Sequence, residues 1–496
     1  MKSKSISKTF SDGKVLLMLT VWSFVILLFL SPDSPFFGLG QRIDSAWFFQ
    51  GGAAWMNGMR PYVDFTDSKG PLLWLIYGLG YLISPRSYVG VYVVSSLFYM
   101  GTLFFNYKTA SLFFKDSKTA LAATLPMIFV YFWPWFHYEV RAEDFALLFV
   151  SISLYILIKR ICKKNLSGKE TNLDYFLLGV SFVALTLIKF NIAIMQGVII
   201  LCVLWLQFRS KKDLGRSITS MVIGAVTTLL PFIVYFLLTD TLGAFIQEYF
   251  INTFKTIEDA NNNNSSYMAD INRALGDRRI IAFFIVIVIG SVLFGIRMPR
   301  YKAVPAVIAI AFIALATRHN IWNYYYDTCH IFILFLLVSL LAISFTKARY
   351  TLFTIAAGLI MVYCIYGNLI MGELRINTIL TNHPDKVAFQ KLSDVMKDTE
   401  KPKILYYKAN VFGFGVMYEA LPAGNQWAYQ TDATPEMRKD HIDLLNSRKA
   451  DFVVTYCREN QLEKKGDLKE IEAAGYELKE HCVYMNLPFY MYERKK

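Results

Sequence analysis

Residues 15–31 read VLLMLTVWSFVILLFLS, an apolar run that contains no charged side chain. The run is close to the length that an α-helix needs to cross a bilayer. It follows four lysines within the first 14 residues and ends in Ser-Pro-Asp at 31–33, without the small-residue cleavage site of a signal peptide. We therefore expect a retained first transmembrane helix whose amino end faces the cytoplasm.

The composition also indicates a membrane protein. Of the 496 residues, 55% are hydrophobic and 18% are charged, whereas soluble domains carry about 25% charged residues. The formal net charge of +13 would favour a nucleic-acid partner in a soluble chain. Here the basic residues lie in short segments between apolar runs, so we interpret them as topology signals. We expect membrane lipids as partners and no nucleic acid.

The apolar runs predict about eleven transmembrane helices within residues 1–371, although several runs are shorter than the usual ~20 residues. With the amino terminus inside, the segments assigned to the cytoplasm hold 21 Lys or Arg in 60 residues, and the first outer loop, residues 32–87, holds four in 56. This asymmetry agrees with the positive-inside rule. The expected helices cover residues 15–31, 88–106, 119–136, 144–158, 174–190, 191–208, 218–238, 280–296, 303–317, 331–345 and 350–371.

Two stretches decide the details of this topology. Residues 71–84 are apolar but too short to span, and counting them as a span would place the following basic loops outside. We therefore expect them to form a helix at the membrane interface. Residues 174–208 form one long apolar stretch that Lys189 and Asn191 interrupt. We interpret it as a hairpin with Lys189 near the outer turn; one interrupted helix is the alternative.

Residues 372–496 predict a small α/β domain on the extracytoplasmic side. Helical patterns cover 387–396 and 437–445, and strand patterns cover 404–407, 451–456 and the 483–493 region. On that side of the membrane, Cys457 and Cys482 are able to form a disulfide. The polar run Asn261–Asn264 in the outer loop 239–279 predicts a mobile segment.

The predicted outer face gathers charged and aromatic residues. Residues 41–80 read QRIDSAWFFQGGAAWMNGMRPYVDFTDSKGPLLWLIYGLG, residues 137–144 read HYEVRAED, and residues 318–330 read RHNIWNYYYDTCH. Aromatic faces stack on sugars, cations hold phosphate, and a carboxylate accepts a proton from a hydroxyl. Together these segments favour a site for a sugar phosphate.

The stretch from Asp44 to Leu73 resembles the first outer loop of the GT-C superfamily of membrane glycosyltransferases, which includes protein mannosyltransferases and aminoarabinose transferases of lipid A. The shared elements are an early aspartate, the pattern G-x-x-P-Y-x-D-F, and an acidic residue close to K-x-P-L. Here they are Asp44, residues 58–65, Asp67 and residues 69–72. Residues 141–143 resemble the family's R-x-[D/E], and residues 187–189 its L-T-K with Ile in place of Thr. Lys-Gly-Pro at 69–71 stands where many relatives have Lys-Pro-Pro.

The resemblance implies a polytopic helical fold and an inverting transfer from a polyprenyl-phosphate sugar to a glycan, lipid or protein acceptor. A lipid-linked donor needs no P-loop, G-x-G-x-x-G or D-x-D, and the sequence has none. A divalent metal ion, Mg²⁺ or Mn²⁺, is able to share the neutralisation of phosphate, with Asp67 and Glu143 as its ligands. The expected catalytic residues are Asp44 (the general base), Asp67 and Glu143; the expected phosphate-binding residues are Lys69, Arg141, Lys189 and Arg318; the expected substrate-binding residues are Tyr62, Asp64 and His330.

Each candidate also has a structural interpretation. Asp44 is able to cap a helix that begins at Ser45, and Asp64 suits a turn. Asp67 and Lys69 are able to form a surface ion pair, and His330 is more often a packed residue. Glu143 and Asp144 stand where a helix begins, which favours acids anyway; they lie about 100° apart on a helix, so we expect only Glu143 to face the site.

Two other functions compete with a glycosyltransferase of the inner (plasma) membrane. A transporter or flippase for lipid-linked glycans would show repeats and charges near the membrane midplane, but the chain has no internal repeat and its charges gather in an outer loop. A glycan polymerase would concentrate basic residues in large central outer loops. Residues 239–279 hold only Lys255, Arg273, Arg278 and Arg279.

Overall fold

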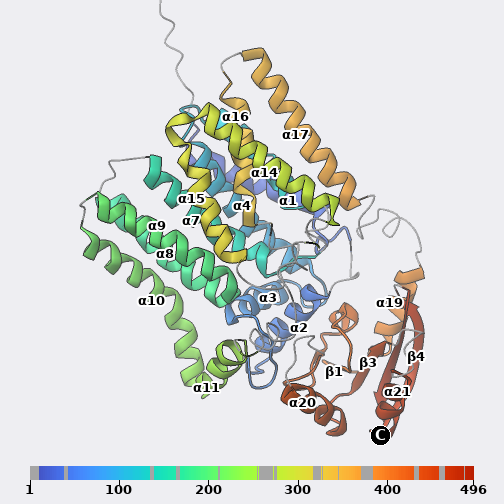
Figure 1. Ribbon diagram of the computed structural model, residues 1–496. Helices are drawn as coiled ribbons and strands as arrows, with labels where there is room; N and C mark the ends of the chain where they lie inside the picture. Colours follow the sequence, from blue (N-terminus) through green and yellow to red (C-terminus); the bar gives the residue numbers. More distant parts are fainter. Residues whose placement is uncertain are drawn as a thin grey trace, which may run out of the picture.

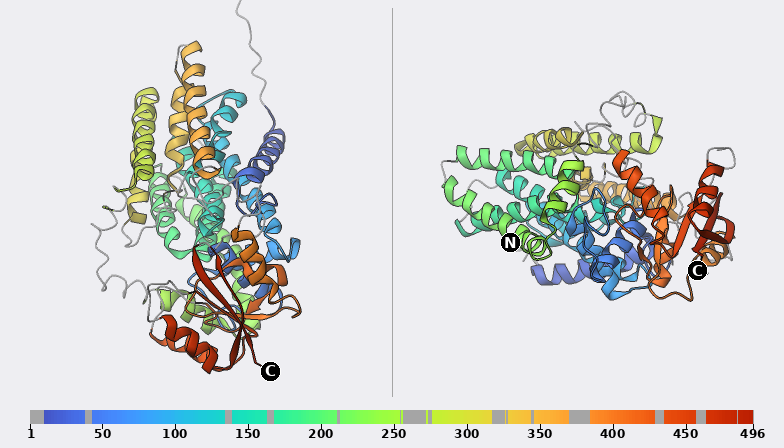
Figure 2. Two further views of the ribbon diagram at one scale, coloured as in Figure 1. Left: turned by 90° about the vertical axis from the view of Figure 1, so that its right-hand side faces the viewer. Right: turned by 90° about the horizontal axis from the view of Figure 1, so that it is seen from below.

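The computed structural model shows a bundle of helices with a small mixed sheet at one end (Figures 1 and 2). The structure describes residues 10–37, 43–133, 139–162, 168–210, 213–253, 255, 272, 276–316, 326, 328–343, 346–369, 384–428, 435–456, 464–484 and 486–495. Arg318, Cys457 and the run Asn261–Asn264 lie outside the described residues.

Each of the eleven expected apolar segments contains helix. Among the described residues, eight helices are long and apolar enough to cross a membrane. Shorter apolar helices accompany them, so the number of eleven spans stays a prediction. The helices of the bundle are α1 (Asp12–Leu30), α4 (Val89–Ala110), α5 (Ser117–Thr124), α6 (Met127–Val130), α7 (Ala142–Cys162), α8 (Gly168–Ile188), α9 (Phe190–Arg209), α10 (Leu214–Leu238), α11 (Leu242–Phe245), the π-helix η1 (Ile246–Asn252), α14 (Arg278–Arg297), the 3₁₀ helix η2 (Pro299–Tyr301), α15 (Ala303–Ala316), α16 (Ile331–Leu341) and α17 (Thr346–Leu369).

The prediction of one helix over 119–136 was wrong in its described part. The chain forms α5 and then the short α6, with Pro126 between them. Proline has no backbone N–H to donate and its ring crowds the preceding turn, so a helix interrupts there.

The hairpin interpretation of 174–208 is confirmed. Only Lys189 separates α8 from α9, and its extended backbone (φ −157°, ψ 104°) reverses the chain. The guanidinium of Arg160 reaches both the start of α8, at Asp174 (3.4 Å), and the end of α9, at Gln207 (3.2 Å). Since one side chain contacts the first turns of α8 and the last turns of α9, the two helices run antiparallel.

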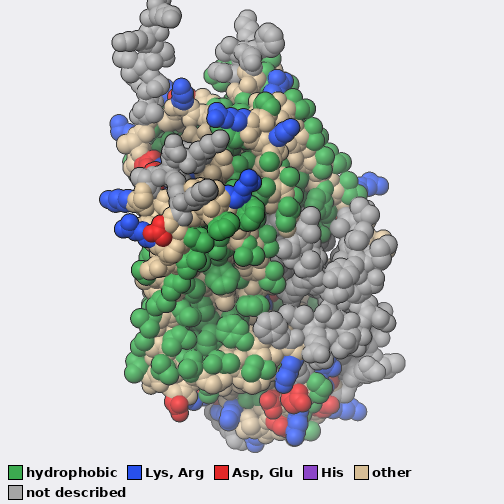
Figure 3. All heavy atoms as spheres, turned by 60° about the vertical axis from the view of Figure 1, so that its left-hand side comes forward, with side chains coloured by type: hydrophobic (Ala, Val, Ile, Leu, Met, Phe, Trp, Pro, Cys, Tyr) green, Lys and Arg blue, Asp and Glu red, His purple; other side chains and the backbone are tan. Residues whose placement is uncertain are grey.

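The segments assigned to the cytoplasm meet at one end of the bundle. Lys108 Nζ lies 3.1 Å from Oδ2 of Asp12, and the rings of Phe113 and Tyr301 lie 5.6 Å apart. Figure 3 shows a broad band of hydrophobic side chains between one end where Lys and Arg outnumber Asp and Glu and an opposite end where the two kinds of charge are mixed. This distribution is the one that the positive-inside rule describes.

Residues 43–88, at the opposite end, are largely helical. They form α2 (Asp44–Met56) and α3 (Pro71–Ile83), and α3 is the helix that we expected at the interface. The two helices pack closely because α2 has glycines where α3 approaches: a Cβ at Gly51 would lie 1.9 Å from the Trp74 ring, and one at Gly52 would lie 2.5 Å from Gly78 N. This packing fixes the direction of α2, whose first residue is Asp44.

The C-terminal segment folds as a five-stranded sheet in the order β2-β1-β3-β5-β4. β1 pairs in parallel with β2 and β3, while β5 pairs antiparallel with β3 and β4. The strands are β1 (Lys403–Tyr406), β2 (Leu421–Pro422), β3 (Phe452–Tyr456), β4 (Tyr476–Tyr484) and β5 (Leu487–Arg494), and the helices are α19 (Pro384–Asp394), the 3₁₀ helix η4 (Gly413–Tyr418), α20 (Pro435–Asn446) and α21 (Lys464–Ala473). The expected α/β class is confirmed, whereas β2, β4 and α21 were not predicted. Cys482 is a free thiol that contacts the Ala388 carbonyl.

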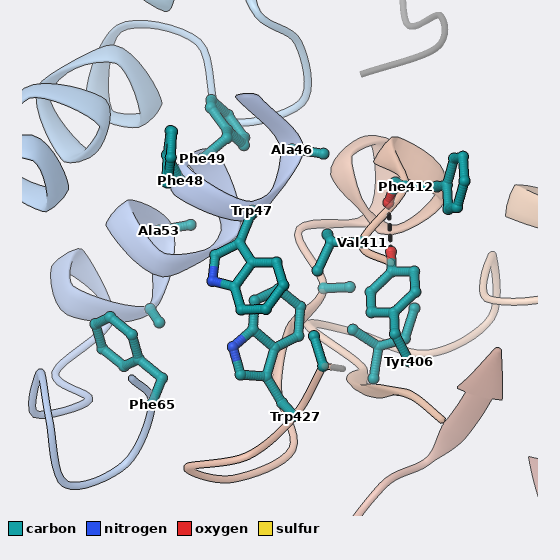
Figure 4. Close-up of a cluster of buried hydrophobic side chains, with 14 of the residues drawn as sticks. Ala46, Trp47, Phe48, Phe49, Ala53, Phe65, Tyr406, Val411, Phe412 and Trp427 are labelled. Atoms are coloured by element: carbon teal, nitrogen blue, oxygen red, sulfur yellow. Dashed lines mark hydrogen bonds between the residues drawn. The ribbon is translucent and has the colours of Figure 1, made fainter. Parts of the chain in front are cut away.

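This sheet domain packs on α2 and α3, and one hydrophobic core extends from these helices into the sheet. Figure 4 shows Trp47 of α2 against Trp427 of the sheet domain, with ring centroids 5.7 Å apart. Polar contacts surround this core: Glu419 pairs with Arg86 (2.9 Å) and accepts from the Tyr81 hydroxyl (2.9 Å). The sheet domain is therefore docked directly beside the segment that carries Asp44.

Candidate functional site

Four segments of the chain meet near the amino end of α2. They are residues 43–45, the loop 67–70, residues 139–144 before and in the first turn of α7, and the break between α8 and α9. Ser45 Oγ and the Tyr77 hydroxyl both donate to the Val140 carbonyl, at 2.6 and 2.7 Å. The first bond joins residues 43–45 to residues 139–144, and the second joins residues 139–144 to α3.

Asp44 and Arg141, two of the expected site residues, form an ion pair. Arg141 Nε lies 3.2 Å from Asp44 Oδ2, and the Arg141 side chain is 4% exposed while that of Asp44 is 40% exposed. Ile43 is the capping residue of α2, and its apolar side chain makes no capping hydrogen bond. The carboxylate of Asp44 therefore faces a cation and solvent rather than the helix backbone.

Glu139 is a site residue that the sequence analysis did not select. Its Oε2 accepts from the backbone N–H groups of Ile43 (2.9 Å) and Ser45 (3.1 Å), on either side of Asp44, and its Oε1 accepts from Arg141 Nη2 (3.0 Å). Burial and the charge of Asp44 raise the pKa of Glu139 to about 7, although Arg141 opposes the shift. The available signal was an acidic residue two positions before Arg141.

The adjacent acids Glu143 and Asp144 point to different partners. Asp144 accepts from the backbone N–H of Arg141 (2.6 Å) and from the Tyr99 hydroxyl. Glu143 pairs with Lys189 Nζ at 2.5 Å. Asp144 therefore fixes the backbone that carries Arg141, and Glu143 connects the start of α7 to the break between α8 and α9.

Both members of the Lys189–Glu143 pair are buried, with side chains 10% and 3% exposed. Lys189 occupies the one non-helical position between α8 and α9, and its side chain extends from this turn to Glu143 at the start of α7. Since a buried charge requires a partner, each of these residues holds the other in place.

The loop 67–70 is packed against the end of α8. The N–H of Gly70 donates to the Ile188 carbonyl (3.1 Å), and a Cβ at Gly70 would lie 2.0 Å from the Leu187 carbonyl oxygen. Only glycine allows this approach. The contact places Lys69 close to Lys189, the residue that precedes α9. Two of the expected phosphate-binding residues therefore lie near each other.

Asp67 and Lys69 form a loose pair within this loop. Lys69 Nζ lies 3.6 Å from Asp67 Oδ1. The Lys69 side chain is 21% exposed, and the Asp67 side chain is 9% exposed. Asp67 Oδ1 also accepts from the backbone N–H of Ser68 (2.6 Å), and Lys69 Nζ lies 5.8 Å from the centroid of the Phe48 ring. Lys69 is the most exposed of the site cations for which a side chain is described.

Tyr62 and Asp64 shape the loop rather than meet Asp44. Tyr62 adopts a left-handed backbone (φ 68°), and its buried hydroxyl donates to the Lys69 carbonyl (2.8 Å). Asp64 accepts from the backbone N–H of Arg60 (2.7 Å) and pairs with its guanidinium (3.3 Å) at an exposed turn. Tyr62 thus supports Lys69, and Asp64 has the geometry of a turn residue.

His330 lies in the helical core and is 1% exposed. Its Nε2 lies 3.2 Å from Ser151 Oγ, and its ring contacts Tyr131 at 5.2 Å. These neighbours belong to the bundle, and the described contacts do not join His330 to Asp44 or Lys69. Its expected role in substrate binding stays a prediction.

The residues expected to bind a metal ion, Asp67 and Glu143, each face a lysine. An ammonium group occupies the place beside each carboxylate that a cation would take. Within the described ranges, no group of three or more His, Cys, Asp or Glu side chains is arranged to hold a metal ion. This arrangement does not fit the expected metal site, so no metal ion enters the reaction derived below.

No family model and no curated protein sequence matches the chain. Among solved structures, it is similar to ArnT from Cupriavidus metallidurans bound to undecaprenyl phosphate, with a TM-score of 0.61 and 10% identity over 97% of this chain and 98% of that chain. The archaeal oligosaccharyltransferase AglB from Archaeoglobus fulgidus, in complex with an inhibitory peptide and a dolichol-phosphate, gives a TM-score of 0.48 and 10% identity over 97% of this chain and 74% of that chain. The likeness to ArnT shows that the two chains share a fold over nearly their whole length.

Proposed function

We propose that this GT-C-fold protein is a glycosyltransferase that moves a sugar from a polyprenyl-phosphate donor to an acceptor hydroxyl at the membrane surface. The observation that carries the proposal is the partly exposed carboxylate of Asp44, held by Arg141 beside a second group of cations. ArnT, which has a similar fold, binds undecaprenyl phosphate, and this supports a donor of the same class.

Asp44 acts as the general base in this proposal. Its carboxylate takes the proton of the acceptor hydroxyl while the acceptor oxygen bonds to the anomeric carbon of the sugar. The bond between that carbon and the phosphate oxygen breaks, and the electron pair leaves with the polyprenyl phosphate. A single displacement of this kind inverts the configuration at the anomeric carbon.

The cations neutralise the charge that develops on the leaving phosphate. Lys189 and Arg141 are buried and tightly paired, so they act through their fixed positive charge. Lys69 is more exposed, and its ion pair with Asp67 is longer, at 3.6 Å. Breaking that loose pair costs little, so Lys69 is the side chain that turns to contact the phosphate.

The orientation follows from the distribution of basic residues. We assign the protein to the inner (plasma) membrane of a bacterial cell, with the Lys- and Arg-rich end in the cytoplasm and the sheet domain outside. The donor then reaches Asp44 and Lys69 from the membrane plane, and the acceptor, which is a glycan, lipid or protein, reaches Asp44 from the side of the sheet domain.

The direct test compares lipid-linked sugars and surface glycans, by mass spectrometry, in cells with and without the protein. The expected result is the loss of one sugar from a surface product and the accumulation of its lipid-linked precursor. Wild-type protein should restore the product, and Asp44→Asn should not.

A second measurement separates the enzyme from a flippase. In detergent solution there are no two membrane leaflets, so only an enzyme is able to convert a lipid-linked sugar there. Unchanged products in cells that lack the protein, together with no transfer in detergent, would refute the proposal.

A further inference from the structure

The interface between α2 and the sheet domain contains three buried side-chain atoms that lack a hydrogen-bond partner among the described residues. Two are donors, the indole nitrogens Nε1 of Trp47 and Trp427, and one is an acceptor, Oε1 of Gln50. Trp47 and Gln50 belong to α2, and Trp427 belongs to the segment that follows β2. Buried polar groups are normally satisfied, so this concentration requires a physical reason.

The two indoles form one unit. Their ring centroids lie 5.7 Å apart with an interplanar angle of 61°, and Figure 4 shows both nitrogens on the same side of the pair. Tyr406 packs on Trp427 at 5.7 Å and accepts a bond from Gln50 Nε2 at 3.4 Å. Trp427 is fully buried, and Trp47 is 9% exposed.

This unit lies one helical turn from the proposed base. Asp44 and Trp47 are three residues apart on α2, so they share a face and are separated by about 4.5 Å along the axis. The carboxylate of Asp44 is partly exposed, whereas Trp47 is covered by Trp427. The edge of the sheet domain therefore borders the space that an acceptor occupies when its hydroxyl meets Asp44.

We propose that the interface between α2 and the sheet domain binds the acceptor and that the acceptor is a carbohydrate, an inference that rests on the proposed function. A sugar hydroxyl both accepts and donates hydrogen bonds, so a polyhydroxylated ligand satisfies the two indole N–H groups and the Gln50 amide oxygen together. A phosphate group offers acceptors alone, and a lipid chain offers neither. The rings of Trp47 and Trp427 supply the flat apolar surface on which a sugar ring packs.

A peptide acceptor fits this interface less well. Extended peptides bind at a sheet edge through backbone hydrogen bonds, but β2, the edge strand near α2, has only two residues. Since both indole nitrogens are covered, the glycan enters as Trp47 turns away from Trp427. The binding of the acceptor therefore changes the surroundings of both rings.

The first test is ¹⁹F nuclear magnetic resonance of the full-length protein labelled with 5-fluorotryptophan in detergent. The probe is the oligosaccharide released from the surface glycan of cells that lack the protein. We expect the signals of Trp47 and Trp427, assigned from Trp→Phe variants, to shift on titration, while the signal of Trp22 stays constant. Trp22 Nε1 donates to the Leu125 carbonyl (3.0 Å) within the bundle. Constant signals for Trp47 and Trp427 at concentrations that support transfer would overturn the inference.

The second test uses Trp47→Phe and Trp427→Phe, which keep an aromatic ring and remove the N–H. Each should raise the KM for the oligosaccharide about tenfold, since one bond to the acceptor is lost, and leave the affinity for undecaprenyl phosphate within about twofold. Trp22→Phe, the matched control, should change neither value. An unchanged KM in both interface variants would show that the unpaired indoles serve packing or hold ordered water, and would refute the inference.

The outcomes distinguish this inference from the proposed function. If the wild-type protein transfers no sugar to any product, the function is wrong. If it transfers sugar and the two variants transfer equally well, the function stands and the acceptor site is wrong. Glycopeptides that appear while the surface glycan stays unmodified would show a protein acceptor and overturn the carbohydrate assignment.

Discussion

Arg141 Nε lies 3.2 Å from Oδ2 of Asp44 at the amino end of α2. The same guanidinium donates to Glu139, which in turn accepts from the backbone on both sides of Asp44. The direction of the Asp44 carboxylate is thus set by two residues that lie about a hundred positions further along the chain. The following predictions test what this arrangement does.

Asp44→Asn should lower turnover at least about 10²-fold, because an amide cannot accept the proton and general-base catalysis contributes about 10²–10⁴-fold. The free energy of unfolding should fall by no more than about 1 kcal/mol, since Asp44 is partly exposed and Arg141 keeps its bond to Glu139. The measurements are sugar transfer and thermal unfolding of purified protein in detergent.

The control for this variant is Asp12→Asn, which also weakens an exposed ion pair, with Lys108 at the other end of the bundle. It should leave turnover unchanged. Near wild-type turnover in Asp44→Asn would remove Asp44 from the mechanism and direct attention to Asp67 and Glu143.

Lys69→Ala should weaken the binding of undecaprenyl phosphate about tenfold or more, since a hydrogen bond to a charged group contributes about 1.5–3 kcal/mol. Stability should hardly change, because the pair with Asp67 is long and Asp67 keeps its hydrogen bonds from Ser68. A binding titration at two salt concentrations measures the effect. Lys115→Ala, in a segment assigned to the cytoplasm, is the control, and equal affinities in the two variants would contradict the role of Lys69.

Lys189→Met should lower the free energy of unfolding by about 3–5 kcal/mol, because it leaves Glu143 buried without its cation. The double variant Lys189→Met/Glu143→Leu should recover much of that loss but not the affinity for undecaprenyl phosphate. Thermal unfolding and phosphate binding, measured together, separate the two roles of Lys189. If the double variant regained full affinity, Lys189 would be a structural residue alone.

Glu139 should make stability fall as the pH rises. Its pKa is raised from 4.5 to about 7 in the folded protein, so the protein favours the protonated form more than the unfolded chain does. This contribution is fully present below about pH 4.5 and is lost as the pH rises through about 7. Glu139→Gln should remove this part of the pH dependence, and melting temperatures between pH 5 and 8 provide the measurement. If the melting temperature of Glu139→Gln fell with pH as steeply as that of the wild type, other groups would be responsible for the pH dependence.

A phosphatase fused after Lys496 should be active, and a reporter that works only in the cytoplasm should be inactive there. The reason is the concentration of 21 Lys or Arg in the segments assigned to the inner side. A fusion within residues 107–118 should give the reverse pattern and serves as the control. Activity of the cytoplasmic reporter at Lys496 would invert the assigned orientation.

The sequence alone determined where most of the helical segments of the membrane domain lie, because a bilayer imposes its own length scale and polarity on each segment. The run 15–31 is long and free of charge, so little but a spanning helix suits it. The break at Lys189 was also visible, since a lysine interrupts an apolar stretch where the chain must turn. The first-loop motif pointed to Asp44, Asp67 and Lys69, and the R-x-[D/E] pattern at 141–143 pointed to Arg141, before their contacts were known.

Only the tertiary structure decided which charges meet. Glu139 and Ile43 are joined across 96 positions. Neither local helix propensity nor the hydrophobic periodicity of the sequence predicts such a contact. Glu143 and Asp144 are adjacent in sequence, yet the start of α7 directs one to Lys189 and the other to Tyr99 and the Arg141 backbone. Likewise Trp47 meets Trp427 because the sheet domain docks on α2. Burial and partner choice are set by the packing of distant segments. The sequence therefore suggested candidate residues and the local pair of Asp67 and Lys69, but neither Glu139 nor the pairs that join distant segments.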